Sequence, residues 1–243
     1  MKLPKRLEPE ILKDSIVQLL FSSDVPPELL LGRFHELFKH SYNFLGSPFR
    51  SDTNRQSAKG LLVQPLSQGY FLDASKRVKV NLNPESITFN CNNSSYSGWD
   101  NYYPVIESTV KGLFESHLIK FVTRVGCRYV TQFENTDLMQ SLNISYTMTV
   151  PKLKLDSSVL KSEFSDNDLK FIITLVNNAM IVDETTKRPS INSFLDIDVI
   201  KLHEGLRVVD EVLSYVNITH ERERELFYSF LKPDFLSSLN PSY

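Results

Sequence analysis

Apolar and polar side chains alternate along a segment in the middle of the chain. Within Ile119 to Glu134, every second residue from Phe121 to Phe133 is apolar, aromatic or threonine, and the residues between them include Arg124, Arg128 and Gln132. Period-2 alternation over this length predicts a strand with one buried and one partly solvated face, as in an antiparallel sheet. Gly126, at the centre of the segment, predicts a bulge or a close approach of another group to the backbone.

The remaining pattern predicts further strands separated by amphipathic helices. The predicted strands cover residues 14–21, 61–66, 70–72, 78–82, 87–91, 142–150, 169–183 and 191–202. The predicted helices cover residues 28–39, 105–117 and 203–216, and a last one begins near Thr219. The segment 41–60, rich in Ser, Asn, Gly and Pro, is predicted to be a long loop and is the best candidate for a mobile or partner-contacting segment.

This order of elements favours the α+β class: a twisted antiparallel sheet with helices packed mainly on one face. Strands and long helices occur in both halves, so we expect two similar lobes, residues 1–135 and residues 136–243. The second lobe would carry the two terminal helices, and both lobes would form one compact unit.

Composition narrows the class of protein. The chain has 243 residues, a formal net charge of -2 and 41% hydrophobic residues, which is typical of a folded globular protein and argues against disorder or a coiled coil. The simplest argument for a nucleic-acid-binding protein is a strongly positive net charge, and this chain, whose net charge is close to zero, does not have one. The charge is unevenly spread, since residues 1–130 hold 16 basic and 12 acidic residues, whereas residues 131–243 hold 11 and 17.

Cysteine content and hydropathy favour a cytoplasmic protein that does not enter membranes. Only Cys91 and Cys127 are present, both in apolar segments, so each is expected to be a buried thiol and no disulfide framework is implied. Charged residues interrupt the N-terminal region before a signal-peptide core forms, and no apolar run approaches the roughly 20 residues of a membrane helix. No phosphate-binding glycine loop, nucleophile elbow or zinc-ligand spacing occurs, so no cofactor is expected.

Two charged pairs are the strongest candidates for chemistry. Asp196 and Asp198 project from one face of a predicted strand and, with Asp183, form a candidate Mg²⁺ or Mn²⁺ site. Arg124 and Arg128 share one face of another strand and suit recognition of phosphate or carboxylate. If the two strands are neighbours, the arginines would simply neutralise the aspartates, which explains both pairs without a ligand.

Aromatic residues gather just before the second predicted helix, in residues 96–104. Trp99 and Tyr102 are candidate partner-binding residues, because exposed rings can stack on bases or pack into another protein. The alternative is that Trp99 and Tyr103 anchor the helix on the sheet, with Tyr102 as the exposed ring. His220 is expected at the surface, beside the start of the last helix.

Several short motifs occur along the chain in a fixed order. They are the opening strand before Pro26-Pro27, Trp99 with Tyr103-Pro104, Gly126-Cys127-Arg128-Tyr129, Leu195-Asp196-Ile197-Asp198, and His220-Glu221 followed by Phe227 and Phe230-Leu231. This order resembles a sporadically distributed, functionally uncharacterised bacterial family of about 250 residues. The resemblance implies a bacterial cytoplasmic protein, and a patchy distribution would suit defence-associated or toxin–antitoxin-like genes.

Three functions follow as hypotheses. The first is a non-enzymatic protein-interaction or regulatory subunit of a bacterial defence or toxin–antitoxin-like system, which binds a protein encoded nearby or associates with itself. The second is a metal-dependent phosphodiesterase or nucleotidyl transferase that uses Asp183, Asp196 and Asp198. The third, not favoured by the charge balance, is a nucleic-acid or nucleotide binder that uses Arg124, Arg128 and the 41–60 loop.

Overall fold

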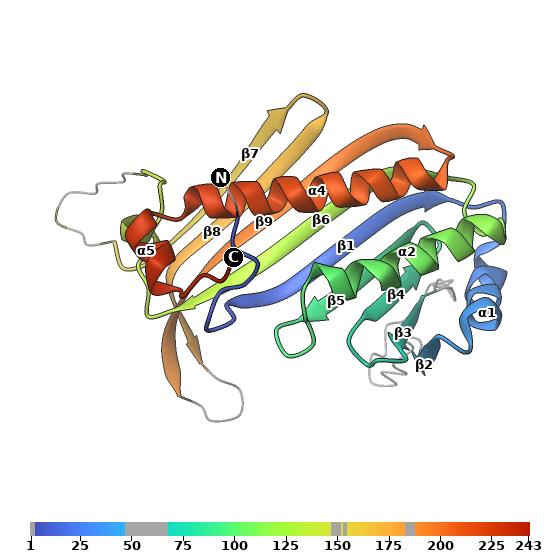
Figure 1. Cartoon of the computed structure of the whole chain (residues 1–243), viewed down its shortest axis with the longest axis horizontal. Helices are drawn as coiled ribbons and strands as arrows, with labels where there is room; N and C mark the ends of the chain where they lie inside the picture. Colours follow the sequence, from blue (N-terminus) through green and yellow to red (C-terminus); the bar gives the residue numbers. More distant parts are fainter. Residues whose placement is uncertain (1–2, 47–67, 147–151, 153–154, 183–187) are drawn as a thin grey trace, which may run out of the picture.

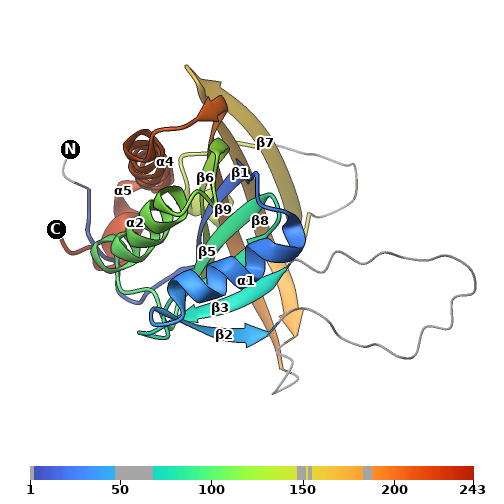
Figure 2. The same ribbon diagram turned by 90° about the vertical axis from the view of Figure 1, so that its right-hand side faces the viewer.

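A single antiparallel sheet forms the body of the protein. The structure, a computed structural model, describes residues 3–46, 68–146, 152, 155–182 and 188–243. Within these ranges, nine strands pair in the order β2-β3-β4-β5-β1-β6-β9-β8-β7. The long helices lie on one side of the sheet, as Figures 1 and 2 show. The predicted α+β class is therefore confirmed.

The elements have the following bounds. The strands are β1 (Leu12–Ser22), β2 (Tyr42–Gly46), β3 (Gly69–Asp73), β4 (Lys79–Asn83), β5 (Ser86–Asn92), β6 (Phe121–Glu134), β7 (Ser158–Asp166), β8 (Leu169–Val182) and β9 (Pro189–Leu206). The helices are α1 (Pro27–Phe38), α2 (Trp99–Glu115), α3 (Leu138–Ser141), α4 (Val209–Phe230) and α5 (Pro233–Ser238).

The topology repeats once along the chain. In the first unit, β1 and α1 precede the meander β2–β5, whose last strand pairs with β1 and leads into α2. In the second unit, β6 and α3 precede the meander β7–β9, whose last strand pairs with β6 and leads into α4. The antiparallel pair β1–β6 joins the two units at the centre of the sheet. The division into lobes at residue 135 stays a prediction, since β6 pairs on one side with β1 and on the other with β9.

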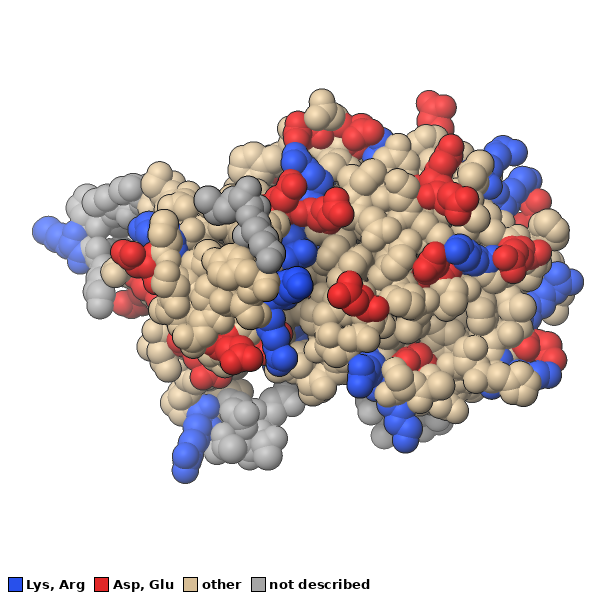
Figure 3. Space-filling model, viewed as in Figure 1, with Lys and Arg blue, Asp and Glu red and all other residues tan. Residues whose placement is uncertain are grey.

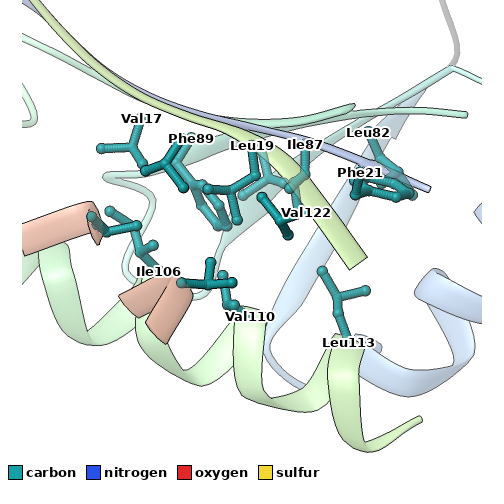
Figure 4. Close-up of a cluster of buried hydrophobic side chains, with 14 of the residues drawn as sticks. Val17, Leu19, Phe21, Leu82, Ile87, Phe89, Ile106, Val110, Leu113 and Val122 are labelled. Carbon is teal, nitrogen blue, oxygen red and sulfur yellow. The ribbon is translucent and has the colours of Figure 1, made fainter. Parts of the chain in front are cut away.

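The first hydrophobic core lies between the sheet and α2. Alternate residues of the central strands point toward the helix, as do Ile106, Val110 and Leu113, spaced at one helical face (Figure 4). Helix α1 adds Leu30 and Phe34 beside β3. Cys91 and Cys127 belong to this cluster as free buried thiols, which confirms their predicted burial.

A second core lies beneath the C-terminal half of α4. It contains Phe133 of β6, the inward residues of β8 and β9, and Phe227 and Leu231 at the end of α4. Helix α4 spans both cores, because Val212 and Val216 belong to the first cluster. The buried residues of α4 between these apolar groups are Thr219, His220 and Glu223, so a polar layer separates the cores.

Several predicted elements differ from the observed ones, and the strand predicted over residues 61–66 lies outside the described residues. Residues 142–146 contain no strand and residues 147–150 lie outside the described ranges, so the strand predicted over 142–150 is not found in the described part. Tyr42–Gly46, expected in a loop, forms β2, and the rest of the 41–60 segment is not described. The two helices expected over 203–216 and from Thr219 form one helix, α4, because Thr219 turns its hydroxyl back to the Tyr215 carbonyl, 2.9 Å away, instead of capping a new helix.

Candidate interaction surfaces

The two predicted charged pairs meet on the face of the sheet that the long helices leave uncovered. Arg128 binds Asp196 through two hydrogen bonds, Nε to Oδ1 at 2.8 Å and Nη2 to Oδ2 at 2.6 Å. Arg124 donates to Asp198 at 3.1 Å and to Gln18 of β1 at 2.6 Å. Strands β6 and β9 are neighbours, so the pairing expected as the explanation without a ligand is the arrangement observed.

Gly126 makes the longer of these two contacts feasible. Arg124 lies opposite Leu202 in the register, so its side chain must run along the sheet to reach Asp198, which lies opposite Arg128. It passes over Gly126, where a Cβ atom would lie 2.9 Å from the guanidinium nitrogens. The predicted close approach at Gly126 is therefore an arginine side chain lying on the bare backbone.

The ion pairs change what this surface can bind. The side chains of Asp198 and Arg124 are 19% and 16% exposed, and burial raises the pKa of Asp198 although Arg124 and Arg128 act to lower it. Both aspartates are occupied by arginines, and Asp183, the third predicted metal ligand, lies outside the described residues. In the described ranges no three His, Cys, Asp or Glu side chains gather as metal ligands would. We therefore place neither a metal nor an anion at this site.

At the start of α2, Tyr102 is buried and Trp99 is partly buried. Tyr102 is 2% exposed and donates a hydrogen bond to the Phe89 carbonyl at 2.8 Å, so its prediction as an exposed ring is wrong. The reason is the helix start: α2 begins at Trp99, before the predicted position 105, and Tyr102 falls four residues before Ile106 on the buried face. Trp99 stacks on His220 of α4, with ring centroids 3.7 Å apart, so it joins two helices.

His220 belongs to a buried hydrogen-bonded chain that crosses the sheet–helix boundary. Its Nδ1 lies 2.9 Å from the hydroxyl of Tyr129, which lies 3.2 Å from the hydroxyl of Tyr96. Burial, aided by Arg224, lowers the pKa of His220 to about 3, so the ring is neutral. The expected surface position is wrong, because residue 220 lies in the middle of α4 on its sheet-facing side and is 3% exposed.

Glu223, one helical turn after His220, is the most unusual side chain in the core. It is 1% exposed, and its Oε2 atom has no hydrogen-bond partner among the described residues. Burial raises the pKa of Glu223 well above its ordinary value, while Arg224 acts to lower it. Both side chains are almost fully buried, too deep for contact with a substrate, so we interpret both as structural groups.

The end of the β8–β9 pair forms a ribbon that extends past its neighbours. Strand β7 begins opposite Asn177 and β6 ends opposite Asn192, so among the described residues 180–182 and 189–191 pair with each other and with no third strand. Met180 lies opposite Ile191, and Val182 opposite Pro189. Since alternate residues share a face, these four apolar side chains form one side of the ribbon. Met180, Val182 and Ile191 are 74%, 53% and 46% exposed.

A cluster of buried polar side chains fixes the base of this ribbon. The register shifts between Val176 and Ala179, where Asn178 takes a φ of 54°. Asn177 accepts from the Leu138 amide at 2.7 Å and donates to Asp137 at 3.0 Å. Ser193 accepts from the Asn178 amide at 2.9 Å. A bulge held in this way re-aims the strands beyond it, so the ribbon leaves the sheet in a defined direction.

Strand β7 is a second accessible feature, at one edge of the sheet. Its outer side pairs with no described strand, and Val159 and Phe164 are 72% and 56% exposed. Next to it, between β7, β8 and the end of α4, lies a cavity of about 460 Å³ lined by Phe164, Phe171, Ile173, Arg222, Leu226 and Phe230. Among the described residues nothing fills the space between α4 and β7, so an apolar hollow lies beside the unpaired edge of β7.

The sequence prediction missed the ribbon and β7 for different reasons. Residues 179–182 were included in a predicted strand, but their exposure depends on how far the neighbouring strands extend. The only sequence signal was the pair Asn177-Asn178 inside an apolar run, which indicates a bulge. In β7 the apolar residues Val159, Leu160 and Phe164 do not alternate, so no strand was predicted.

The charge of the remaining surface and the hydropathy of the helices bear on other kinds of binding site. Acidic and basic side chains both occur across the helix-covered face (Figure 3). None of the described helices is long and apolar enough to cross a membrane.

Comparison of the chain with protein-family models gives no match, and comparison with curated proteins gives none either.

Proposed function

We propose that this chain is a non-enzymatic protein-interaction subunit and that the β8–β9 ribbon is the part that enters its partner. The observation that carries the proposal is the apolar face of the ribbon formed by Met180, Val182, Pro189 and Ile191. Exposed apolar patches of this kind mark interaction sites, since leaving them in water is unfavourable. The bulge at Asn178, held by buried side chains, supports a positioned feature.

The partner that fits this ribbon is a protein with an apolar groove. Although the exposed Arg188 comes just before Pro189, the paired strands of the ribbon, residues 180–182 and 189–191, contain no charged side chain, so the apolar face itself offers nothing to phosphate groups or anionic lipids. The aliphatic side chains and the narrow two-stranded form suit insertion between apolar surfaces. From the resemblance to a bacterial family we further propose that the partner is encoded nearby, in a defence or toxin–antitoxin-like system.

The proposal is tested by site-specific crosslinking in the cells that make the protein. A photo-crosslinking amino acid replaces Met180, and in the control chain it replaces Leu202, which is 60% exposed at the other end of β9. We expect a discrete adduct with one protein at position 180 and none at position 202. The adduct is identified by mass spectrometry, and the protein found is then purified.

Binding of that purified protein is measured by calorimetry. The double variant M180D/V182D should bind at least about tenfold more weakly, because two exposed apolar contacts are replaced by charges, and L202D should bind as the wild type does. Equal binding by M180D/V182D, or equal crosslinking at both positions, would contradict the proposal. Flotation of the chain with lipid vesicles that M180D/V182D abolishes would instead make the ribbon a membrane contact and overturn it.

A further inference from the structure

Strand β7 has the features of a pairing edge. It aligns with β8 over nine consecutive residue pairs, from Ser158 opposite Asn177 to Asp166 opposite Leu169, without a register shift. Its backbone groups on the other side have no strand partner among the described residues. The opposite edge of the sheet, β2, is five residues long and contains a register shift, which discourages pairing. A long, regular, uncovered edge can accept another strand.

The two faces of β7 differ in chemistry. Lys161 and Glu163 lie on the open face of the sheet, where Glu163 already forms a 2.6 Å ion pair with Lys170 of β8. Leu160, Ser162 and Phe164 lie on the helix side, opposite the buried residues of β8. One strand therefore presents a basic and an acidic residue two positions apart on one face, and two apolar residues four positions apart on the other.

We propose that two copies of this chain pair through β7, antiparallel, about a two-fold axis at Ser162. In this register Lys161 of each copy lies opposite Glu163 of the other copy, so two ion pairs form on the open face. On the helix side, Leu160 of each copy lies opposite Phe164 of the other. All nine residues of β7 find a partner, because Ser162 is the midpoint of the strand.

The charges select this register over the adjacent ones. Alternate residues share a face, so a pairing that keeps the faces aligned can only shift its axis by whole residues of β7. An axis at Lys161 would place Lys161 opposite Lys161 of the second copy, and an axis at Glu163 would place two glutamates opposite each other. Like charges directly opposite are destabilising, whereas opposite charges stabilise a strand pair. The full-length register is thus also the charge-complementary one.

Pairing would also shield the apolar corner beside the edge. Phe164, Phe171 and Phe230 line the cavity of about 460 Å³ next to β7. Leu160 of the second copy, opposite Phe164, would lie at the open rim of this cavity and remove apolar surface from water. The exposure of Phe164, 56% in the single chain, would then decrease. Two copies would build one continuous sheet across the interface.

The charge arrangement gives a direct test by sedimentation equilibrium. The wild-type chain should be a dimer, and K161E and E163K should each weaken the dimer at least about tenfold, since every ion pair becomes a like-charge pair. Mixing K161E with E163K should restore a heterodimer, because one copy then carries two acids where the other carries two bases. The swapped variant K161E/E163K should dimerise with itself. Circular dichroism checks that each variant is folded.

Disulfide crosslinking tests the register of the proposed β7–β7 pairing directly. Residues at position 162 of the two copies would have Cβ atoms about 4.5–5.5 Å apart, so S162C should form a covalent dimer on mild oxidation. Ser165 would lie opposite Val159 of the other copy, roughly 20 Å from its own counterpart, so S165C should stay uncrosslinked. The native cysteines are buried and give a low background.

Two outcomes would overturn the inference. One is a wild-type chain that stays monomeric up to millimolar concentration. The other is a dimer that K161E and E163K leave unchanged and that S162C does not crosslink, which would place the contact elsewhere. The ribbon variants M180D and V182D lie outside β7 and should leave the dimer intact. Failure of the β7 interface and failure of the ribbon proposal are therefore distinguishable.

Discussion

At the scale of single residues, the polar layer between the two cores contains two groups whose charge is suppressed. His220 lies against Trp99 and Tyr129, and Glu223 lies one turn further along α4. Both are almost completely buried, so each charged form loses its hydration. Burial acts in opposite directions on the proton equilibria: it lowers the pKa of the histidine and raises that of the glutamic acid. The two residues therefore limit stability at opposite ends of the pH scale.

We expect the free energy of unfolding to be highest between about pH 4.5 and 6.5. Unfolded His220 takes up a proton below pH 6.5 while the folded ring, with its pKa of about 3, does not, so acid destabilises the fold. Unfolded Glu223 loses its proton above pH 4.5 while the folded group keeps it, so stability falls as pH rises. Between these values the two slopes, each at most about 1.4 kcal/mol per pH unit, oppose each other. Urea unfolding across this pH range measures the profile.

The variant E223Q isolates one side of this profile. Glutamine has the shape of the protonated acid but no proton to lose, so its stability relative to wild type should increase with every pH unit above about 4.5. E221Q, an exposed neighbour on the same helix, serves as the control and should follow the wild-type curve. A constant difference between E223Q and wild type over the whole range would show that Glu223 is charged in the folded protein.

Which residue contacts could be predicted depended on the secondary structure that carries them. Strand alternation was enough to predict the ion pairs of Arg124 and Arg128 with Asp196 and Asp198. In a strand, every second side chain lies on the same face of the sheet, wherever the strand begins. The prediction that Tyr102 is exposed was wrong because the face on which a helical residue lies depends on where the helix begins. Helix α2 begins six residues before the predicted start. Burial of His220 was missed for a related reason, since the break expected near Thr219 is absent.

At the scale of elements, the bulge at the base of the ribbon is the feature that local sequence describes least. Whether Met180 and Val182 are buried or exposed is decided by the ends of β6 and β7, which are far away in sequence. Local alternation predicts a strand in either case. The buried amide of Asn177 and the hydroxyl of Ser193 hold the transition between the nine-stranded sheet and the two-stranded ribbon.

We expect N177A to loosen this transition. The substitution removes the acceptor of the Leu138 amide and the donor to Asp137, and it leaves a buried N–H group without its partner. The free energy of unfolding should fall by about 1–3 kcal/mol, and amide exchange in the ribbon should accelerate more than in the centre of β8. S190A, an exposed position in the ribbon itself, should change stability by less than about 1 kcal/mol. Equal exchange in wild type and N177A would mean that the cluster does not hold the ribbon.

At the scale of the whole molecule, two topologically similar units share one sheet. The repeat was expected only as two similar lobes, because the same order of strands and helices is built from sequences without detectable similarity. Alternation and helical spacing specify that a position is apolar, and many sequences satisfy that condition. The junction between the units contains β1–β6 pairing over ten residue pairs and the stacking of Trp99 on His220.

This junction leads us to expect a single cooperative unfolding transition. Separating the units would expose one edge of β1 and one of β6 and would open the core where α2 meets α4, so neither unit should persist alone. Trp99 is the only tryptophan, and it reports the α2–α4 contact by fluorescence, whereas far-ultraviolet circular dichroism reports the secondary structure of the whole chain. The two probes should give the same urea midpoint and the same m-value. A fluorescence change at lower urea than the dichroism change would show that the units separate before they unfold, and would divide the chain into two independent domains.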